Sequence, residues 1–214
     1  MRVITLDERA VRWSGAPDGR PLVVMLHGYY GTADDWAQFF PLVPDHVVAA
    51  SLQAPVPLDD RWSWVDFAKD GVAGVTAVVR GILGWLDMFP AAPVALLGWS
   101  QGAATSVHLL RSDPERPVAV AGLGGFLWEP RPHQGVAQRR PPVFAGWGER
   151  EDVVTPRQHR QARAWLEVHC DTTLRSYPGV GHELTEDMAR DALDFVLPAL
   201  TADTDRRSRL PAGR

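Results

Sequence analysis

Ser100 lies at the centre of the pattern Gly98-Trp99-Ser100-Gln101-Gly102. An apolar run precedes the pattern directly and a predicted helix follows it, which is the context of a serine held on a tight, strained turn. The glycines fit this turn because larger side chains would collide with neighbouring backbone. A serine exposed in this way can attack an acyl carbonyl, and the start of the helix favours the negative charge that develops. The same residues also fit an ordinary turn, so the partners of Ser100 decide the interpretation.

His182 is the best-placed base for Ser100. It follows Val180-Gly181 in the loop between the last predicted strand and the last predicted helix, where it can reach over the carboxyl edge of a parallel sheet. A hydroxyl nucleophile needs such a base within hydrogen-bond reach, and the base needs a third group that fixes its tautomer. Surface or packing roles suit the histidines on other predicted helices and connections: His46, His108, His133, His159 and His169.

The third group is expected after the predicted strand that ends at Trp147. The loop from Gly148 to Pro156 offers three carboxylates there, Glu149, Glu151 and Asp152. A solvated, charged loop accounts for Glu149, whereas one of the other two would complete the chain order serine, acid, histidine.

A second glycine-containing loop, His27-Gly28-Tyr29-Tyr30-Gly31, follows the first long apolar run. Such a loop can turn a backbone N–H toward the nucleophile, and the residue after the serine supplies a second N–H. We therefore predict an oxyanion hole made by the amides of Tyr29 and Gln101, worth about 10²–10³ in rate per donor. His27 is expected to hold the loop in place through its side chain.

The elements that must position these residues alternate between strands and helices, which predicts an α/β fold with a mostly parallel sheet covered on both faces. Residues 2–13 suggest a short hairpin. We expect one domain over residues 1–200 and a disordered polar tail over 201–214. The predicted strands are 21–26, 47–50, 93–98, 118–123, 142–147 and 172–177, and the predicted helices are 66–89, 101–112, 155–169 and 183–197, with Pro198 ending the last one.

These motifs together resemble the phospholipase/carboxylesterase family of α/β-hydrolases, small esterases, lysophospholipases and acyl-protein thioesterases of the cytosol. The likeness covers most of residues 20–200 and includes Ala54-Pro55 and the run from Trp62 to Asp66. The family's Asp-x-Val-x-Pro run favours Asp152 as the acid, four residues before Pro156, with Glu151 as the alternative. The chain has Trp99 where members commonly have Phe, which changes the floor of the substrate pocket.

The resemblance implies a serine carboxylesterase that cleaves small-molecule esters through an acyl-enzyme, without a metal or organic cofactor. Few residues separate Phe126 from the strand at Pro142, so no helical cap is expected and short to medium acyl chains are favoured. Aromatic side chains that could line the pocket, or simply pack in the core, are Tyr30, Trp62, Trp64, Trp99 and Trp128. The alternatives are an acyl thioesterase or lysophospholipase with the same triad, and a catalytically inactive binding protein on the same scaffold. A dienelactone hydrolase is less similar, because its nucleophile is usually a cysteine.

Composition excludes several other classes. The chain has 214 residues, a formal charge of −4 and one cysteine, Cys170. It therefore lacks the basic excess of a nucleic-acid-binding protein and cannot form an intramolecular disulfide. No signal peptide or transmembrane stretch is visible, so we expect a cytoplasmic protein without a membrane span.

Overall fold

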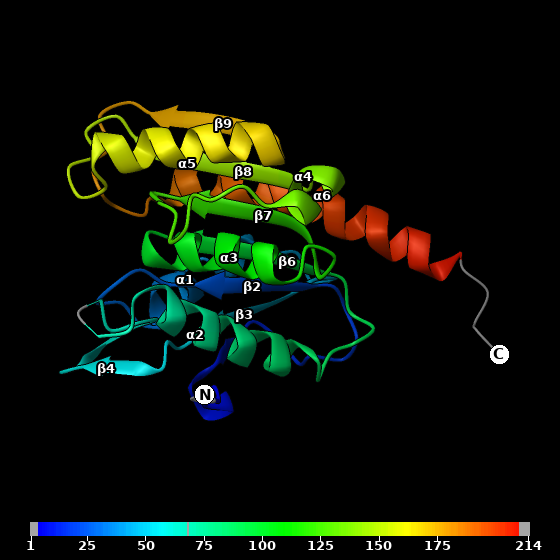
Figure 1. Cartoon of the computed structure of the whole chain (residues 1–214). Helices are drawn as coiled ribbons and strands as arrows, with labels where there is room; N and C mark the ends of the chain where they lie inside the picture. Colours follow the sequence, from blue (N-terminus) through cyan, green and yellow to red (C-terminus); the bar gives the residue numbers. More distant parts are fainter. Residues whose placement is uncertain (1–3, 68, 210–214) are drawn as a thin grey trace.

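A seven-stranded sheet forms the centre of the molecule in the computed structural model, which describes residues 4–67 and 69–209 (Figure 1). Its first strand pairs antiparallel with its neighbour and the other strands run parallel. The predicted α/β architecture with a mostly parallel sheet is confirmed. In spatial order the strands are β1 (Arg12–Trp13), β3 (Val48–Leu52), β2 (Leu22–Leu26), β6 (Val94–Trp99), β7 (Pro117–Leu123), β8 (Pro142–Gly148) and β9 (Asp171–Tyr177).

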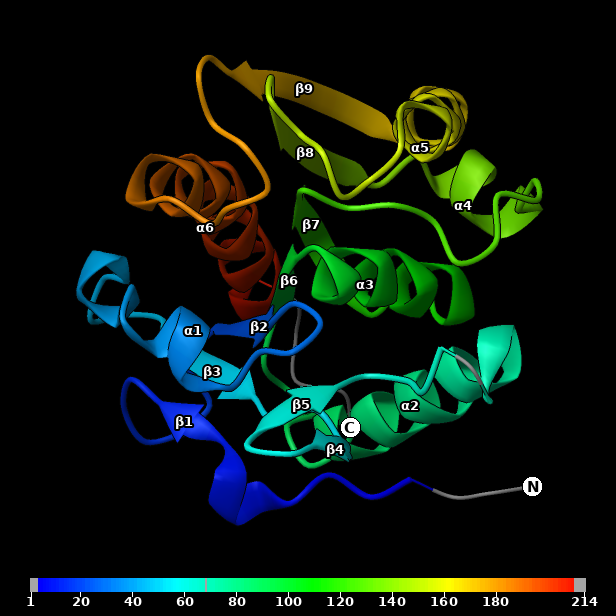
Figure 2. The same cartoon turned by 90° about the vertical axis from the view of Figure 1, so that its left-hand side faces the viewer.

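Helices cover both faces of this sheet (Figure 2). On one face lie α2 (Gly71–Leu86), α3 (Gln101–Ser112) and α5 (Pro156–His169), and on the other lie α1 (Asp34–Ala37) and α6 (Glu186–Ser208). Successive residues of β2 alternate between the two cores, with Val24 in the first and Val23 and Met25 in the second. This double coverage explains why the central strands read as continuous apolar runs.

The carboxyl edge of the sheet is left open. Between β7 and β8 the chain forms only loops and one short helix, α4 (Gln134–Arg139). Two further strands, β4 (Val56–Leu58) and β5 (Arg61–Ser63), make a small separate hairpin. Within the described residues no large cap domain covers the edge, as the sequence predicts.

The N-terminal hairpin predicted for residues 2–13 is wrong where the structure describes it. Residues Glu8–Ala10 form a 3₁₀ turn capped by Asp7, and β1 pairs with β3 rather than with a preceding strand. Residues 1–3 lie outside the described residues. The pairing joins parts of the chain far apart in sequence, which local patterns do not reveal.

The last helix also departs from the prediction. Pro198 does not end α6, which continues to Ser208, so the disordered tail predicted for 201–214 is wrong as far as residue 208. Proline removes one helical hydrogen bond, but Leu200 beyond it is fully buried in the core. Arg206 and Arg207, one turn past Asp203, both bond its carboxylate and extend the helix further. Residues 210–214 lie outside the described part of the chain.

Candidate active site

Ser100 sits on the turn between β6 and α3, at the carboxyl edge of the sheet. Its backbone has φ 51° and ψ −113°, a left-handed conformation that is costly for a residue with a side chain. The Ser100 amide donates to the carbonyl of Leu123 at 2.8 Å, which ties the turn to β7. The strained turn predicted from the sequence is therefore present.

Two glycines make this turn possible. A Cβ on Gly102 would lie 2.0 Å from the carbonyl oxygen of Leu26, and one on Gly98 would lie 2.5 Å from the backbone of Ala103. Neither position can hold a larger side chain unless backbone moves. Glycine is therefore needed at these two positions of the motif because β6, α3 and β2 approach each other closely there.

His182 reaches Ser100 from the loop between β9 and α6. Its Nε2 lies 2.9 Å from the Ser100 Oγ. The loop packs over the end of β8, where a Cβ on Gly148 would lie 2.3 Å from the carbonyl oxygen of Val180. The ring of Trp99 lies against the imidazole, with 4.8 Å between centroids. The imidazole is therefore held between Trp99 and the loop with one nitrogen at the serine.

Glu151 binds the other nitrogen of this imidazole. Its Oε2 lies 2.7 Å from His182 Nδ1, while its Oε1 accepts the amides of Val153 and Val154 at 2.8 Å each. The carboxylate side chain is only 7% exposed. Burial alone would raise the pKa of Glu151, but the bonds from His182 and the two amides outweigh it and hold that pKa below its ordinary value. Glu151 is thus a buried, ionised acceptor.

The prediction that Asp152 would contact His182 is wrong. Asp152 is exposed, and within the described chain the carboxylate that bonds the imidazole belongs to its neighbour Glu151. A turn closed by the Glu151 amide on the carbonyl of Gly148, at 3.3 Å, sets the register of the loop. That turn directs residue 151 inward, and counting back from Pro156 does not reveal it.

The loop from His27 to Gly31 lies beside Ser100. A Cβ on Gly28 would lie 3.4 Å from the Ser100 Cβ and 2.8 Å from the Trp99 ring. Within the described residues, neither the Tyr29 amide nor the Gln101 amide donates a hydrogen bond. Both N–H groups predicted for the oxyanion hole therefore have no protein acceptor among the described residues.

His27 holds this loop, as the sequence predicts, from a completely buried position. Its Nδ1 bonds the carbonyl of Gly28 at 2.7 Å, and its Nε2 accepts the Ala54 amide at 3.1 Å. Burial lowers the pKa of His27 to about 4, although the Gly28 carbonyl opposes the shift. The imidazole is neutral at physiological pH, and its hydrogen bonds connect the His27–Gly31 loop to Ala54.

The aromatic residues suggested as pocket lining separate into two groups. Trp99 lies against His182, and Tyr30 and Trp128 belong to a surface aromatic cluster described below. Trp62 pairs with Gly31 through its backbone, and Trp64 is fully buried and donates its indole N–H to the carbonyl of His27 at 2.7 Å. Trp64 is therefore a structural residue behind the loop.

The side chain of Gln101 fastens the segment after β5 to the turn of Ser100, a role that its sequence position did not reveal. Its Oε1 accepts the Trp64 amide at 2.9 Å and its Nε2 donates to the Ser63 hydroxyl at 3.0 Å. Gln101 is itself completely buried. The Ser63–Trp64 backbone is therefore positioned directly by the residue that follows Ser100.

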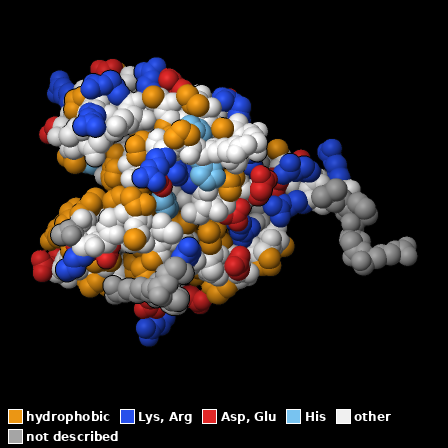
Figure 3. Space-filling view, viewed as in Figure 1, with side chains coloured by type: hydrophobic (Ala, Val, Ile, Leu, Met, Phe, Trp, Pro, Cys, Tyr) orange, Lys and Arg blue, Asp and Glu red, His pale blue; other side chains and the backbone are white. Residues whose placement is uncertain are grey.

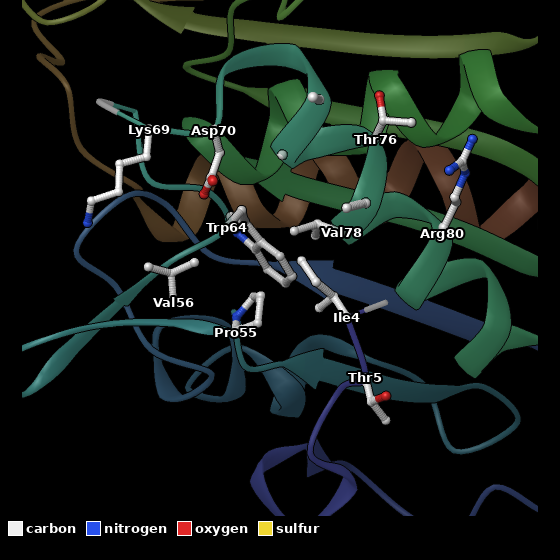
Figure 4. Close-up of a pocket in the computed structure, with 13 residues that line it drawn as sticks. Ile4, Thr5, Pro55, Val56, Trp64, Lys69, Asp70, Thr76, Val78 and Arg80 are labelled. Carbon is white, nitrogen blue, oxygen red and sulfur yellow. The ribbon is translucent and has the colours of Figure 1, made fainter. Parts of the chain in front are cut away.

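A large cavity of about 690 Å³ opens elsewhere, between the N-terminal segment, β4 and α2 (Figure 4). Its wall includes Ile4, Trp64, Asp70 and Arg80. Neither Ser100 nor His182 lines it, so it is distinct from the serine, histidine and glutamate cluster. Convergence of chemical groups, rather than cavity size, identifies the candidate active site.

The sheet, the strained serine turn and the histidine loop together define an α/β-hydrolase fold. Residues 78–198, more than half of the chain, match the family model described as phospholipase/carboxylesterase. The chain belongs to this family of hydrolases, as the sequence motifs indicate.

Solved structures share the fold. Esterase PE8 has a TM-score of 0.68 and 23% identity over 97% of this chain and 100% of its own. Acyl-protein thioesterase 2 from Zea mays has a TM-score of 0.69 and 21% identity over 89% of this chain and 98% of its own. The Bacillus cereus carboxylesterase has a TM-score of 0.72 and 15% identity over 88% and 93%. At these identities the likeness concerns the fold. The search of curated proteins finds no match.

Two features are absent from the described residues. No described helix is long and apolar enough to cross a membrane. No group of three or more His, Cys, Asp or Glu side chains in that part of the chain is arranged to hold a metal ion.

Proposed function

We propose that this chain is a serine hydrolase of carboxylic esters, with Ser100 as nucleophile, His182 as general base and Glu151 as the orienting acid. The observation that carries the proposal is the position of the imidazole, 2.9 Å from the Ser100 Oγ and 2.7 Å from the Glu151 carboxylate. An ionised carboxylate only accepts, so it fixes the proton of His182 on Nδ1 and leaves Nε2 free to accept.

In the first half of the reaction, His182 Nε2 takes the Ser100 proton as Oγ attacks the ester carbonyl. The carbonyl oxygen becomes an oxyanion against the amides of Tyr29 and Gln101, which have no protein acceptor among the described residues. The imidazolium is stabilised by Glu151. It then gives its proton to the departing alcohol as the C–O bond breaks, leaving an acyl-serine.

In the second half, water attacks the acyl-serine. His182 accepts a proton from this water, the tetrahedral oxyanion forms again, and the proton returns to Ser100 Oγ as the carboxylic acid leaves. Apart from water no other co-reactant is needed, since His182 passes on each proton that it accepts within the same half-reaction.

The open carboxyl edge favours small-molecule esters with short to medium acyl chains. An acyl thioester or a lysophospholipid would need the same groups, and one structure of similar fold bears the name acyl-protein thioesterase. A matched series of esters and one acyl thioester would rank these substrates by kcat/KM. An inactive binding protein is disfavoured because serine, histidine and acid all lie in bonding position.

The decisive test is labelling by a fluorophosphonate, which reacts with an activated serine. The parent protein is expected to be labelled and to hydrolyse p-nitrophenyl acetate, whereas Ser100→Ala should lose labelling and at least about 10⁴-fold of the activity. Ser106→Ala, a change to a buried serine of α3, is the matched control and should still be labelled. Equal labelling of the parent and Ser100→Ala would overturn the proposal.

A further inference from the structure

Aromatic rings form a continuous surface row beside the candidate active site. All the exposed aromatic side chains of the described residues are found in it: Tyr29 at 52%, Tyr30 at 49% and Phe67 at 51% exposure. Trp128 and Phe126, which are partly buried, extend the row. These five residues are called the aromatic ladder below. Exposed apolar side chains gathered in one place, unlike scattered ones, indicate a binding surface.

The rings of the ladder contact one another in sequence. Centroids lie 6.5 Å apart from Tyr30 to Tyr29, 5.4 Å from Tyr29 to Phe67, 5.2 Å from Phe67 to Trp128 and 5.1 Å from Trp128 to Phe126. These separations and the tilted or edge-to-face angles are those of favourable ring pairs. Phe67 lies in the middle of the ladder, where its ring contacts Tyr29 on one side and Trp128 on the other.

The two ends of the ladder belong to loops that pack against Trp99, the residue before Ser100. Tyr29 follows Gly28, where a Cβ would lie 2.8 Å from the five-membered ring of Trp99. Phe126 follows Gly124 closely, where a Cβ would lie 2.6 Å from the six-membered ring of the same tryptophan. Trp99 precedes Ser100 directly, so both loops that carry the ladder pack against the residue next to the serine.

The segment that carries Phe67 is also fixed to this turn. Gln101 bonds the Trp64 amide, and the Ser63 hydroxyl donates to the carbonyl of Val65 at 2.6 Å. Phe67 therefore projects from a chain held only three residues earlier by the residue that follows Ser100. Its exposure is combined with a backbone anchored, three residues earlier, to the turn of Ser100.

The space-filling view shows hydrophobic side chains gathered along both sides of a hollow at the left of the molecule (Figure 3). That is the side toward which the strand arrows of Figure 1 point, and thus the carboxyl edge where Ser100 lies. The loops that carry the ladder pack against Trp99 and Ser100 at this edge, so the exposed rings are available to a molecule bound beside the serine. An aromatic group can pair with them, whereas a saturated group of the same size gains only from burial.

We propose that Phe67, at the centre of the aromatic ladder, is a specificity-determining residue that selects esters carrying a planar aromatic ring. This inference rests on the proposed ester hydrolysis and adds the substrate class. The ring of the substrate lies along the ladder while its ester carbonyl lies at Ser100. Phe67 takes no part in bond making and acts by binding the ring in the transition state as well as in the bound substrate.

Matched ester pairs test this proposal. Methyl phenylacetate and methyl cyclohexylacetate differ only in aromaticity on the acyl side, and benzyl acetate and cyclohexylmethyl acetate do so on the alcohol side. Hydrolysis is followed by acid release, which avoids an aromatic reporter group. In at least one pair the aromatic ester should be preferred by about 2- to 10-fold in kcat/KM, the size of a ring-pair contribution.

Three variants sharpen the measurement. Phe67→Leu keeps an apolar side chain but removes the ring, and should bring the preference ratio close to one. Phe67→Tyr keeps the ring and should retain the ratio. Val168→Ala, at an exposed apolar position of α5, is the matched control and should retain it too. Unchanged melting temperatures would verify that all three variants are folded.

Two outcomes would overturn the proposal. One is a parent enzyme that hydrolyses all four esters but shows no aromatic preference in either pair. The other is an aromatic preference that survives unchanged in Phe67→Leu. Both leave ester hydrolysis itself intact, whereas absence of hydrolysis and of fluorophosphonate labelling would instead refute the proposed function together with its substrate class.

Discussion

The two flanks of Ser100 are built on different physical principles. On one flank, His182 and Glu151 are joined by short hydrogen bonds, and the carboxylate is almost completely buried. On the other flank, the ladder is held by ring contacts, and its residues Tyr29, Tyr30 and Phe67 are about half exposed. Directional bonds fix atoms to within a fraction of an ångström, whereas ring contacts tolerate displacement. The comparison suggests that one flank performs chemistry while the other selects what is bound.

After removal of the Ser100 hydroxyl, the largest effect on activity should come from changing the acid. Glu151→Gln retains the size of the side chain but not its charge, so His182 loses the partner that fixes its tautomer and stabilises its protonated form. We expect kcat to fall by about 10³–10⁴-fold with ester substrates. Asp152→Asn changes an exposed neighbour and should stay within about 2-fold of the parent. A larger loss in Asp152→Asn than in Glu151→Gln would contradict the triad drawn here.

His27 is expected to have an intermediate effect, and its effect is on the pH dependence of stability. It belongs to neither flank but holds the loop of Tyr29. Its pKa is about 4 in the folded protein and near 6.5 when unfolded. Between these values the unfolded chain binds a proton that the folded protein does not, so stability falls as the pH falls from about 6.5 to 4. The total loss is roughly 3 kcal/mol, and no further loss from this group occurs below pH 4.

Urea unfolding at several pH values measures this dependence. His27→Gln should be less stable at pH 7 because bonds to the loop are lost, but its stability should decline less steeply on acidification than that of the parent. Other histidines with lowered pKa values, such as His108 and His133, add to the slope of both proteins and cancel in the difference. Parallel pH curves for the two proteins would mean that His27 is not the buried neutral group described.

The smallest effect is expected on the aromatic flank. Tyr29→Leu removes a ring but keeps the backbone N–H assigned to the oxyanion hole. It should lower kcat/KM for benzyl acetate by about 2- to 5-fold and change ethyl acetate less. Met88→Ala, at an exposed position after α2, provides the control. An equal loss of 100-fold or more in kcat/KM with both esters would show that the Tyr29 side chain takes part in the reaction itself. The distinction between the two flanks would then be wrong.

The parts of the site that could be predicted are those encoded locally. The tight turn at Ser100 depends on glycines two residues before and after it, so a five-residue sequence pattern is enough to predict its geometry. The histidine loop was equally accessible, because Gly181-His182 lies between a strand and a helix. The register of the acid loop was not, since one turn decides whether residue 151 or 152 faces inward.

Long-range contacts account for what could not be predicted. The ladder combines Tyr29, Phe67 and Trp128, and no pattern along the chain marks such distant residues as neighbours. The continuation of α6 past Pro198 has the same origin, because the buried Leu200 outweighs a local helix breaker. Tertiary packing therefore overrides local propensity in both places.

The left-handed backbone of Ser100 has a consequence for how this protein can change over generations. A non-glycine residue in such a conformation costs about 1–3 kcal/mol, and glycine would relieve that cost while removing the hydroxyl. Under the proposed function, thermal stability and catalytic turnover therefore place opposite demands on residue 100. Variants selected only for surviving high temperature would be expected to drift toward glycine at this position, and only a requirement for product keeps the serine there.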